Sequence, residues 1–208
     1  VDDVCVATQG SFEDHLRDVG MVFDKLIEGG FGVRCDKVHI GMREVPYLGF
    51  MVGAFGTRPQ ESKVAPILEM AYDLMLSDPA NAPARFAGML GFYSKFIPNL
   101  NILLAPFHEL RAKGAEHLNI VGGKTKQGWA VGSLRFRAAF EAAKHALASI
   151  TALRRADPSK KFYIDVDAAS SCGIGAALMQ LDDESDPESL APVAFWSRRL
   201  ADEERGYS

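Results

Sequence analysis

Two pairs of aspartates are the residues whose types and spacing best suit metal chemistry in this chain. Asp2 and Asp3 stand directly before a short apolar run. Asp165 and Asp167 alternate with apolar residues, which places both acids on one face of an expected strand. Carboxylates at such places suit Mg²⁺, which prefers oxygen ligands and keeps waters and substrate phosphates. A pair of such ions about 3.5–4 Å apart would stabilise the attacking and leaving oxygens of phosphoryl transfer. Plain exposed acids are the alternative for each pair.

The other reactive side chains form no recognisable site. The five histidines show no ligand spacing, and the three cysteines lie far apart without a Cys-x-x-Cys pair. This pattern argues against a structural zinc site and a disulfide scaffold, and it fits a reducing compartment. Tyr93 and Phe96, near Lys95, could stack on bases, although aromatic residues at this spacing more often belong to a core.

Composition narrows the class of protein. The chain has 208 residues, of which 48% are hydrophobic and 24% charged, so it has room for one large domain or two small ones and is not disordered. Its formal charge of -4 excludes a uniformly basic nucleic-acid coat. Residues 91–145 nevertheless carry eight basic side chains against three acidic ones. This section could follow a phosphate backbone, and a solvated helical surface would fit equally well. No apolar run approaches the roughly 20 residues that span a bilayer.

The elements that must position these residues read as a mixed α+β chain. Ser11 and Asp14 resemble a capping box, and the apolar spacing from Phe12 to Leu26 predicts an amphipathic helix that faces inward and ends at Gly29. A run at 4–7 and the arms of a hairpin at 37–40 and 45–52 read as strands, and 53–59 as a turn-rich linker. The remaining pattern predicts helices within 60–112 and at 136–150, a loop at 113–128, and strands at 162–166, 174–181 and 192–196.

Several motifs in this order resemble the polymerase polyprotein of gypsy-type (Ty3-like) long-terminal-repeat retrotransposons. Val1-Asp2-Asp3 looks like the end of the Tyr-x-Asp-Asp box of reverse transcriptase. The sequence Val-Pro-Tyr-Leu-Gly-Phe at 45–50 resembles the primer-grip hairpin, and the run at 90–99 resembles the Leu-Gly…Tyr-Tyr-Arg-x-Phe-Ile-Pro-Asn motif. Asp167 with the following Gly-Ile-Gly at 173–175 resembles the first catalytic strand of the ribonuclease H domain. The resemblance covers nearly the whole chain.

This resemblance implies an α+β fold in three sections. Residues 1–58 would form the C-terminal part of the reverse transcriptase palm with its primer-grip hairpin. Residues 59–128 would form a helical thumb or connection. Residues 129–208 would form the N-terminal part of a ribonuclease H-like α/β domain.

The resemblance also implies an activity, RNA-directed DNA polymerase with ribonuclease H, and a role for particular residues. Mg²⁺ is the implied cofactor, with Mn²⁺ as an alternative, and the partners are an RNA/DNA template–primer duplex and deoxynucleoside triphosphates, with no membrane and an intracellular place of action. The implied catalytic residues are Asp2, Asp3, Lys37 and Asp167, of which the three aspartates bind metal; Asp165 stays an alternative to Asp167. The implied nucleic-acid contacts are Tyr47, Leu48, Gly49, Tyr93 and Lys95.

Three other interpretations stay open. The chain could be a non-catalytic, retroelement-derived nucleic-acid-binding protein, a decayed element without function, or a fragment of a pararetrovirus-type polymerase. In the polymerase family the first polymerase aspartate lies upstream of the position of Val1, and further ribonuclease H acids lie beyond the position of Ser208. We therefore expect the isolated chain to perform neither reaction.

Overall fold

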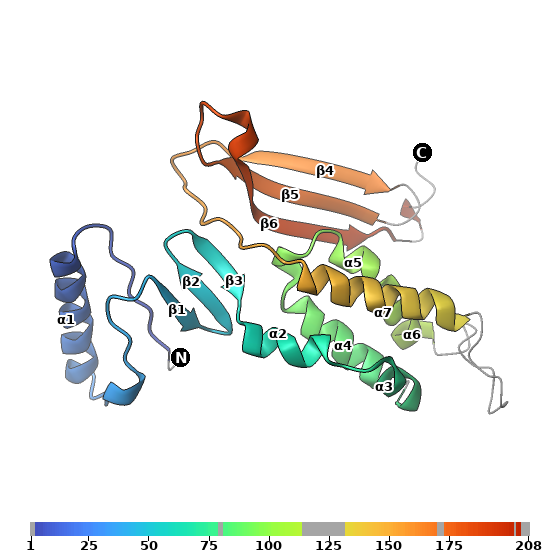
Figure 1. The fold of residues 1–208 in the computed structure, drawn as a ribbon, viewed down its shortest axis with the longest axis horizontal. Helices are drawn as coiled ribbons and strands as arrows, with labels where there is room; N and C mark the ends of the chain where they lie inside the picture. Colours follow the sequence, from blue (N-terminus) through green and yellow to red (C-terminus); the bar gives the residue numbers. More distant parts are fainter. Residues whose placement is uncertain (1–2, 79–80, 114–131, 170–172, 202, 205–208) are drawn as a thin grey trace.

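Two small antiparallel sheets flank a body of helices, which confirms the α+β class (Figure 1). The computed structural model describes residues 3–78, 81–113, 132–169, 173–201 and 203–204. Among these residues, no helix is both long and apolar enough to cross a membrane. The elements are α1 (Phe12–Glu28), η1 (Cys35–Lys37), β1 (Glu44–Tyr47), β2 (Phe50–Gly53), β3 (Gly56–Pro59), α2 (Glu61–Leu68), α3 (Tyr72–Ser77), α4 (Ala82–Gly91), η2 (Ser94–Phe96), α5 (Leu100–Leu103), α6 (Ala105–Lys113), α7 (Gly132–Ala148), β4 (Tyr163–Ala169), β5 (Gly173–Leu181), η4 (Pro187–Ser189) and β6 (Leu190–Arg199).

Helix α1 begins with the predicted capping box. The Ser11 hydroxyl accepts a hydrogen bond from the Asp14 amide at 3.2 Å, and the Asp14 carboxylate accepts one from the Ser11 amide at 3.0 Å. These bonds from Ser11 hold the pKa of Asp14 below its usual value. The expected inward apolar face is only partly correct, because Val19 alone is buried while Phe12 and Leu16 are exposed. The segment at Gly41 lies beside the Phe12 ring but leaves it more than half exposed.

The first sheet differs from the expected hairpin. The predicted second arm at 45–52 breaks at Leu48 and Gly49 into β1 and β2, which pair with each other instead of with 37–40, and β3 adds a third strand where the composition of 53–59 indicates a linker. Residues 4–7 and 38–40 form no strand, although their composition favours one. A strand needs a paired neighbour for its backbone groups, and the described chain offers none at either place. Local propensity therefore gives the wrong answer there.

The hydrophobic core lies in the helices, where α7 packs against α2, α5 and α6. Phe86 and Phe140 meet at 4.7 Å between ring centroids, and Phe107 and Phe136 meet at 4.5 Å. All four rings are almost fully buried. The helix at the start of the expected C-terminal section thus belongs to the helical body, and β4–β6 follow it as a separate sheet (Figure 1).

The second sheet has the strand order β4-β5-β6, and its three strands agree with those predicted from sequence. The linker between α7 and β4 ties both sheets together. Leu153 and Thr57 exchange two backbone hydrogen bonds of 2.9 Å, and the Arg154 amide donates to the Pro192 carbonyl at 2.8 Å. A side chain on Gly56 would overlap the Leu153 carbonyl, so this close approach requires glycine.

We predict that Phe86→Ala lowers the free energy of unfolding by about 3–5 kcal/mol, because it leaves a cavity among the four core rings. Chemical denaturation followed by circular dichroism measures this change. Phe55 is 81% exposed and provides the matched control, since Phe55→Ala should change stability by less than about 0.5 kcal/mol. Equal losses in the two variants would contradict the assignment of the core.

Candidate nucleic-acid interface

The tip of the β1–β2 hairpin has a backbone that its sequence does not favour. Tyr47 pairs with Phe50, so only Leu48 and Gly49 form the turn, with φ values of 50° and 85°. Two positive φ values define a type I′ turn, in which asparagine and glycine are preferred. A leucine at the first position is strained, and such strain persists mostly where function requires it. The Leu48 side chain is also 56% exposed.

This tip lies against the segment between α4 and η2. The ring of Phe50 stacks on Phe92 at 4.8 Å and 8° between ring planes. The Lys95 ammonium lies 4.6 Å from the centroid of Phe50 and 5.0 Å from that of Phe96, which are cation–π contacts. A Cβ on Gly49 would be in contact with the Phe92 ring. The structure therefore brings together two motifs that lie over 40 residues apart in sequence.

The resulting surface, which we call the tip surface, consists of Leu48, Gly49, Phe92 and Lys95. Phe92 is 54% exposed although Phe50 stacks on it, and Lys95 is exposed. An exposed ring, an apolar side chain and a fixed cation can contact bases, sugars and phosphates respectively. Sequence reasoning missed Phe92 as a candidate. Its place beside Tyr93 in the same motif could have indicated it.

Tyr47 and Tyr93, both predicted to contact nucleic acid, differ in their exposure. Tyr47, at the end of β1, is partly buried and lies beside the tip. Tyr93 is only 3% exposed and belongs to the core of the helical body, where burial raises the pKa of its phenol. The expectation that Tyr93 contacts nucleic acid is therefore corrected: its ring packs in the core, as aromatic residues at this spacing usually do.

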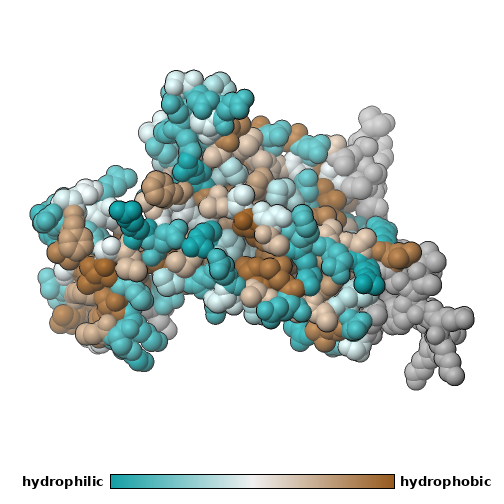
Figure 2. Space-filling model, in the orientation of Figure 1, coloured by the Kyte–Doolittle hydropathy of each residue, from teal (hydrophilic) through white to brown (hydrophobic). Residues whose placement is uncertain are grey.

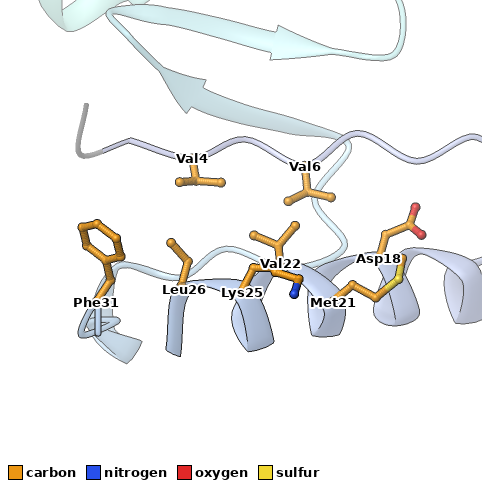
Figure 3. A pocket seen from close by; sticks show the side chains of 8 residues that line it. All are labelled: Val4, Val6, Asp18, Met21, Val22, Lys25, Leu26 and Phe31. Atoms are coloured by element: carbon orange, nitrogen blue, oxygen red, sulfur yellow. The ribbon is translucent and has the colours of Figure 1, made fainter. Parts of the chain in front are cut away.

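The structure describes only one of the two acidic residues at the start of the chain. Asp2 lies outside the described residues. Asp3 is exposed, in an extended segment 3–8 that runs between α1 and the first sheet (Figures 1 and 3). Lys37, in η1, is also exposed. None of the described contacts joins Lys37 to Asp3.

An apolar groove of about 490 Å³ separates the segment 3–8 from α1 (Figure 3). It is lined by Val4, Val6, Asp18, Met21, Val22, Lys25, Leu26 and Phe31. Apolar side chains gather over α1 on the molecular surface as well (Figure 2). Apart from Asp18 and Lys25 these lining residues are apolar, as expected of an incompletely covered helix face.

Asp165 and Asp167 lie on the exposed strand β4. Asp165 pairs with Ala177 and Asp167 with Gly175 across the antiparallel ladder, so both carboxylates share one face of the sheet. No cluster of three or more acidic, histidine or cysteine residues that could hold a metal occurs in the described part of the chain. The described acids can therefore supply only part of a metal's ligand set.

Comparison with known proteins identifies what this arrangement resembles. Residues 135–208 match the family described as an RNase H-like domain found in reverse transcriptase. The whole chain is similar to retrotransposon Pol polyproteins. It is 29% identical to the retrovirus-related Pol polyproteins from transposon 297 and transposon gypsy of Drosophila melanogaster, and 24% identical to the transposon Tf2-3 polyprotein of Schizosaccharomyces pombe. All of the chain is covered in each case, but it spans only 17%, 19% and 14% of those relatives.

Solved structures support the fold. The chain superimposes on a foamy viral protease-reverse transcriptase dRH in complex with double-stranded DNA with a TM-score of 0.71. A second structure, the foamy viral enzyme in complex with an RNA/DNA hybrid, gives a TM-score of 0.69. Both cover 97% of this chain, 32% and 24% of the viral chains, at 17% identity. The arrangement of helices and two small sheets is therefore shared with part of the foamy viral chains.

We predict that Leu48→Asn raises the free energy of unfolding by about 1 kcal/mol, because asparagine accepts the positive φ that leucine resists. Thermal and chemical denaturation measure the change. Leu134, which is 66% exposed on α7, is the control, since Leu134→Asn should lower stability by about 0.5 kcal/mol through weaker helix propensity. A destabilised Leu48→Asn variant would show that the tip is not strained.

Proposed function

We propose that this chain is a section of a retroelement polymerase that copies RNA into DNA and cuts the RNA of the resulting hybrid. The observation that carries the proposal is the similarity of all 208 residues to retrotransposon Pol polyproteins. In the proposed arrangement, residues 1–58 complete the palm, 59–128 form the thumb or connection, and 129–208 begin the ribonuclease H-like domain. The gypsy-type subfamily is part of the proposal.

The proposed polymerase reaction is nucleotidyl transfer. The 3′-hydroxyl oxygen of the primer gives up its proton to solvent and bonds to the α-phosphorus of a deoxynucleoside triphosphate, and the bond to pyrophosphate breaks. Asp2 and Asp3 would hold Mg²⁺ or Mn²⁺, which stabilises the charge on the attacking and leaving oxygens. Lys37 would donate a proton to the departing pyrophosphate. Asp3 is exposed and can reach solvent and substrate, while the other ligands would come from Asp2 and from other parts of the polyprotein.

The tip surface would hold the primer end. Its strained turn presents Leu48 and Gly49, and the Phe50–Phe92 stack fixes their position relative to Lys95. A small misplacement of a primer end costs rate steeply, so rigid support is the useful property here. Lys95 would contact a phosphate without reading sequence. The foamy viral structures, which hold duplexes, support duplex binding by analogy of fold.

The proposed second reaction is hydrolysis of the RNA strand. A water molecule loses a proton to solvent as its oxygen bonds to the scissile phosphorus, and the bond to the ribose 3′-oxygen breaks as that oxygen takes up a proton from solvent. Asp167 would be one ligand of the metal ions at this site. It lies at an exposed strand within the segment that matches the RNase H-like family.

We predict that Asp167→Asn, introduced into the polyprotein that carries this chain, lowers RNA cleavage at least about 100-fold and leaves DNA synthesis intact, because one metal ligand is lost. Cleavage of labelled RNA in a hybrid and primer extension with Mg²⁺ measure the two activities. Asp165→Asn is the matched control on the same strand face and should retain both. If Asp165→Asn abolishes cleavage and Asp167→Asn does not, the ligand assignment is reversed.

The same assays separate the proposal from its main rival. The isolated 208-residue chain should incorporate no nucleotide and cut no RNA, since its described residues hold no cluster of three or more side chains that could bind a metal. A non-catalytic binding protein predicts that the polyprotein itself is inactive and insensitive to Asp3→Asn and Asp167→Asn. Robust primer extension by the isolated chain would refute our division of the ligand sets.

We predict that Lys95→Ala weakens binding of the 208-residue chain to an RNA/DNA duplex and reduces the slope of log K against log salt by about 1, because one phosphate contact is lost. Fluorescence anisotropy over a range of KCl concentrations measures both quantities. Lys161 is an exposed control outside the tip surface, and Lys161→Ala should leave the slope unchanged. Equal slopes for Lys95→Ala and wild type would exclude the contact.

A further inference from the structure

Alternate residues of β6 attach the second sheet to the helical body. Phe195 packs against the buried core, Ser197 contacts α5, and Arg199 donates to Glu109 of α6 at 2.7 Å. Trp196, which lies between Phe195 and Ser197 in sequence, is 55% exposed on the opposite face. One face of β4–β6 is therefore turned toward the helices, and we call it the inner face.

Ser197 is the polar centre of this contact. Its hydroxyl accepts a hydrogen bond from the Asn101 amide at 3.0 Å, and its carbonyl accepts one from the Asn101 carboxamide at 2.6 Å. Ser197 is only 6% exposed. Loss of either bond would leave a buried polar group without its partner, so the contact has one preferred geometry.

Gly175 allows the helices to come close to the sheet beside Ser197. A Cβ on Gly175 would overlap the carboxamide oxygen of Asn99, and one on Gly173 would lie 2.9 Å from Ile102. Asn99 has a φ of 54°, a conformation that asparagine tolerates better than other residues with side chains. The Pro-Asn turn before α5 and the Gly-Ile-Gly motif of β5 therefore fit each other across the interface.

The same row of the sheet contains Asp167. Asp167 pairs with Gly175, and Gly175 pairs with Ser197, so the three residues share the inner face. The Asp167 backbone lies one strand beyond the Asn99 contact, a spacing of about 4.8 Å. The position of Asp167 relative to the helical body is thus set through Gly175.

We infer that Asn99 and Gly175 are positioning residues that fix the strand of Asp167 against the helical body, and this inference rests on the proposed role of Asp167 in RNA cleavage. Asn99 does not touch the reacting atoms in this scheme. It acts through β5, so that a hybrid held on the helical body meets Asp167 at a fixed place. Loss of the fit should impair RNA cleavage and leave DNA synthesis unaffected.

Three variants test the inference. Gly175→Ala introduces the overlap with Asn99 and should push the sheet away from α5. The double variant Asn99→Gly, Gly175→Ala removes the obstructing side chain while glycine keeps the positive φ, so it should restore docking. Gly88→Ala is the matched control, because a Cβ at Gly88 on α4 meets nothing within 4 Å.

Docking is measured in the 208-residue chain with spin labels at positions 134 and 164, after replacement of the native cysteines by serine. Leu134 of α7 and Ile164 of β4 are both exposed. We expect one narrow distance distribution for wild type, Gly88→Ala and the double variant, and a longer or broader one for Gly175→Ala. An unchanged distribution in Gly175→Ala overturns the inference.

Function is measured in the polyprotein by RNA cleavage and primer extension. Gly175→Ala should cut RNA about 100-fold more slowly with normal primer extension, and the double variant should recover most of the loss. If Gly175→Ala fails to fold, the double variant decides, because a folded double variant that does not cleave overturns the inference. A wild-type enzyme that extends primers but cuts no RNA would overturn the proposed cleavage function and the positioning role with it. The distances between the spin labels would still report whether the sheet docks on the helices.

Discussion

The packing of α7 among the helices of residues 61–113 is the constraint on which the other parts of the structure depend. Phe136 and Phe140 of α7 complete a core with Phe86 and Phe107, and the four rings are almost fully buried. Burial of each such ring contributes on the order of 2–3 kcal/mol. Both sheets are attached to this helical body, and their strands pack against its core without forming part of it.

The attachments of the two sheets differ in kind from the core. The first sheet is held by the Phe50–Phe92 stack and by the Thr57–Leu153 backbone pair. The second is held by the Asn101–Ser197 bonds and by the ion pair of Glu109 with Arg199. Several other ion pairs join exposed side chains two or three residues apart, within α1 or at η1, and such pairs contribute little. Directional bonds and close fits therefore orient the sheets, while general surface charge does not.

The sequence predicts the elements well where a segment's own pattern decides them. The capping box of α1, the helix α7 and the strands β4, β5 and β6 follow from side-chain types and periodicity. Pairing decides the failures: residues 4–7 favour a strand but have no described partner, and β3 forms in a glycine-rich stretch because β2 is beside it. Propensity is a weak guide wherever pairing with a neighbouring strand decides whether a segment becomes a strand.

The sequence pattern alone also does not predict which face of a strand is turned toward the helices. The alternation in β4 places its acids on one face and Ile164 and Val166 on the other, and hydrophobicity favours the apolar pair as the buried one. In the structure neither pair is buried: Ile164 is 68% and Val166 59% exposed, and the acids, which are also exposed, share the face of Gly175 and Ser197 that is turned toward the helices. The reason is in β5 and β6, whose glycine and serine fit α5.

These contacts form one continuous connection between the two candidate sites. The hairpin tip is stacked on Phe92, the segment that follows it forms η2, and η2 and α5 both lie against β6. Through β6 and β5 the connection reaches the strand of Asp167. Each link is either a close packing contact or a pair of hydrogen bonds, and packed protein interiors deform little. These contacts would therefore fix the distance between a duplex bound at the tip surface and the acids of β4.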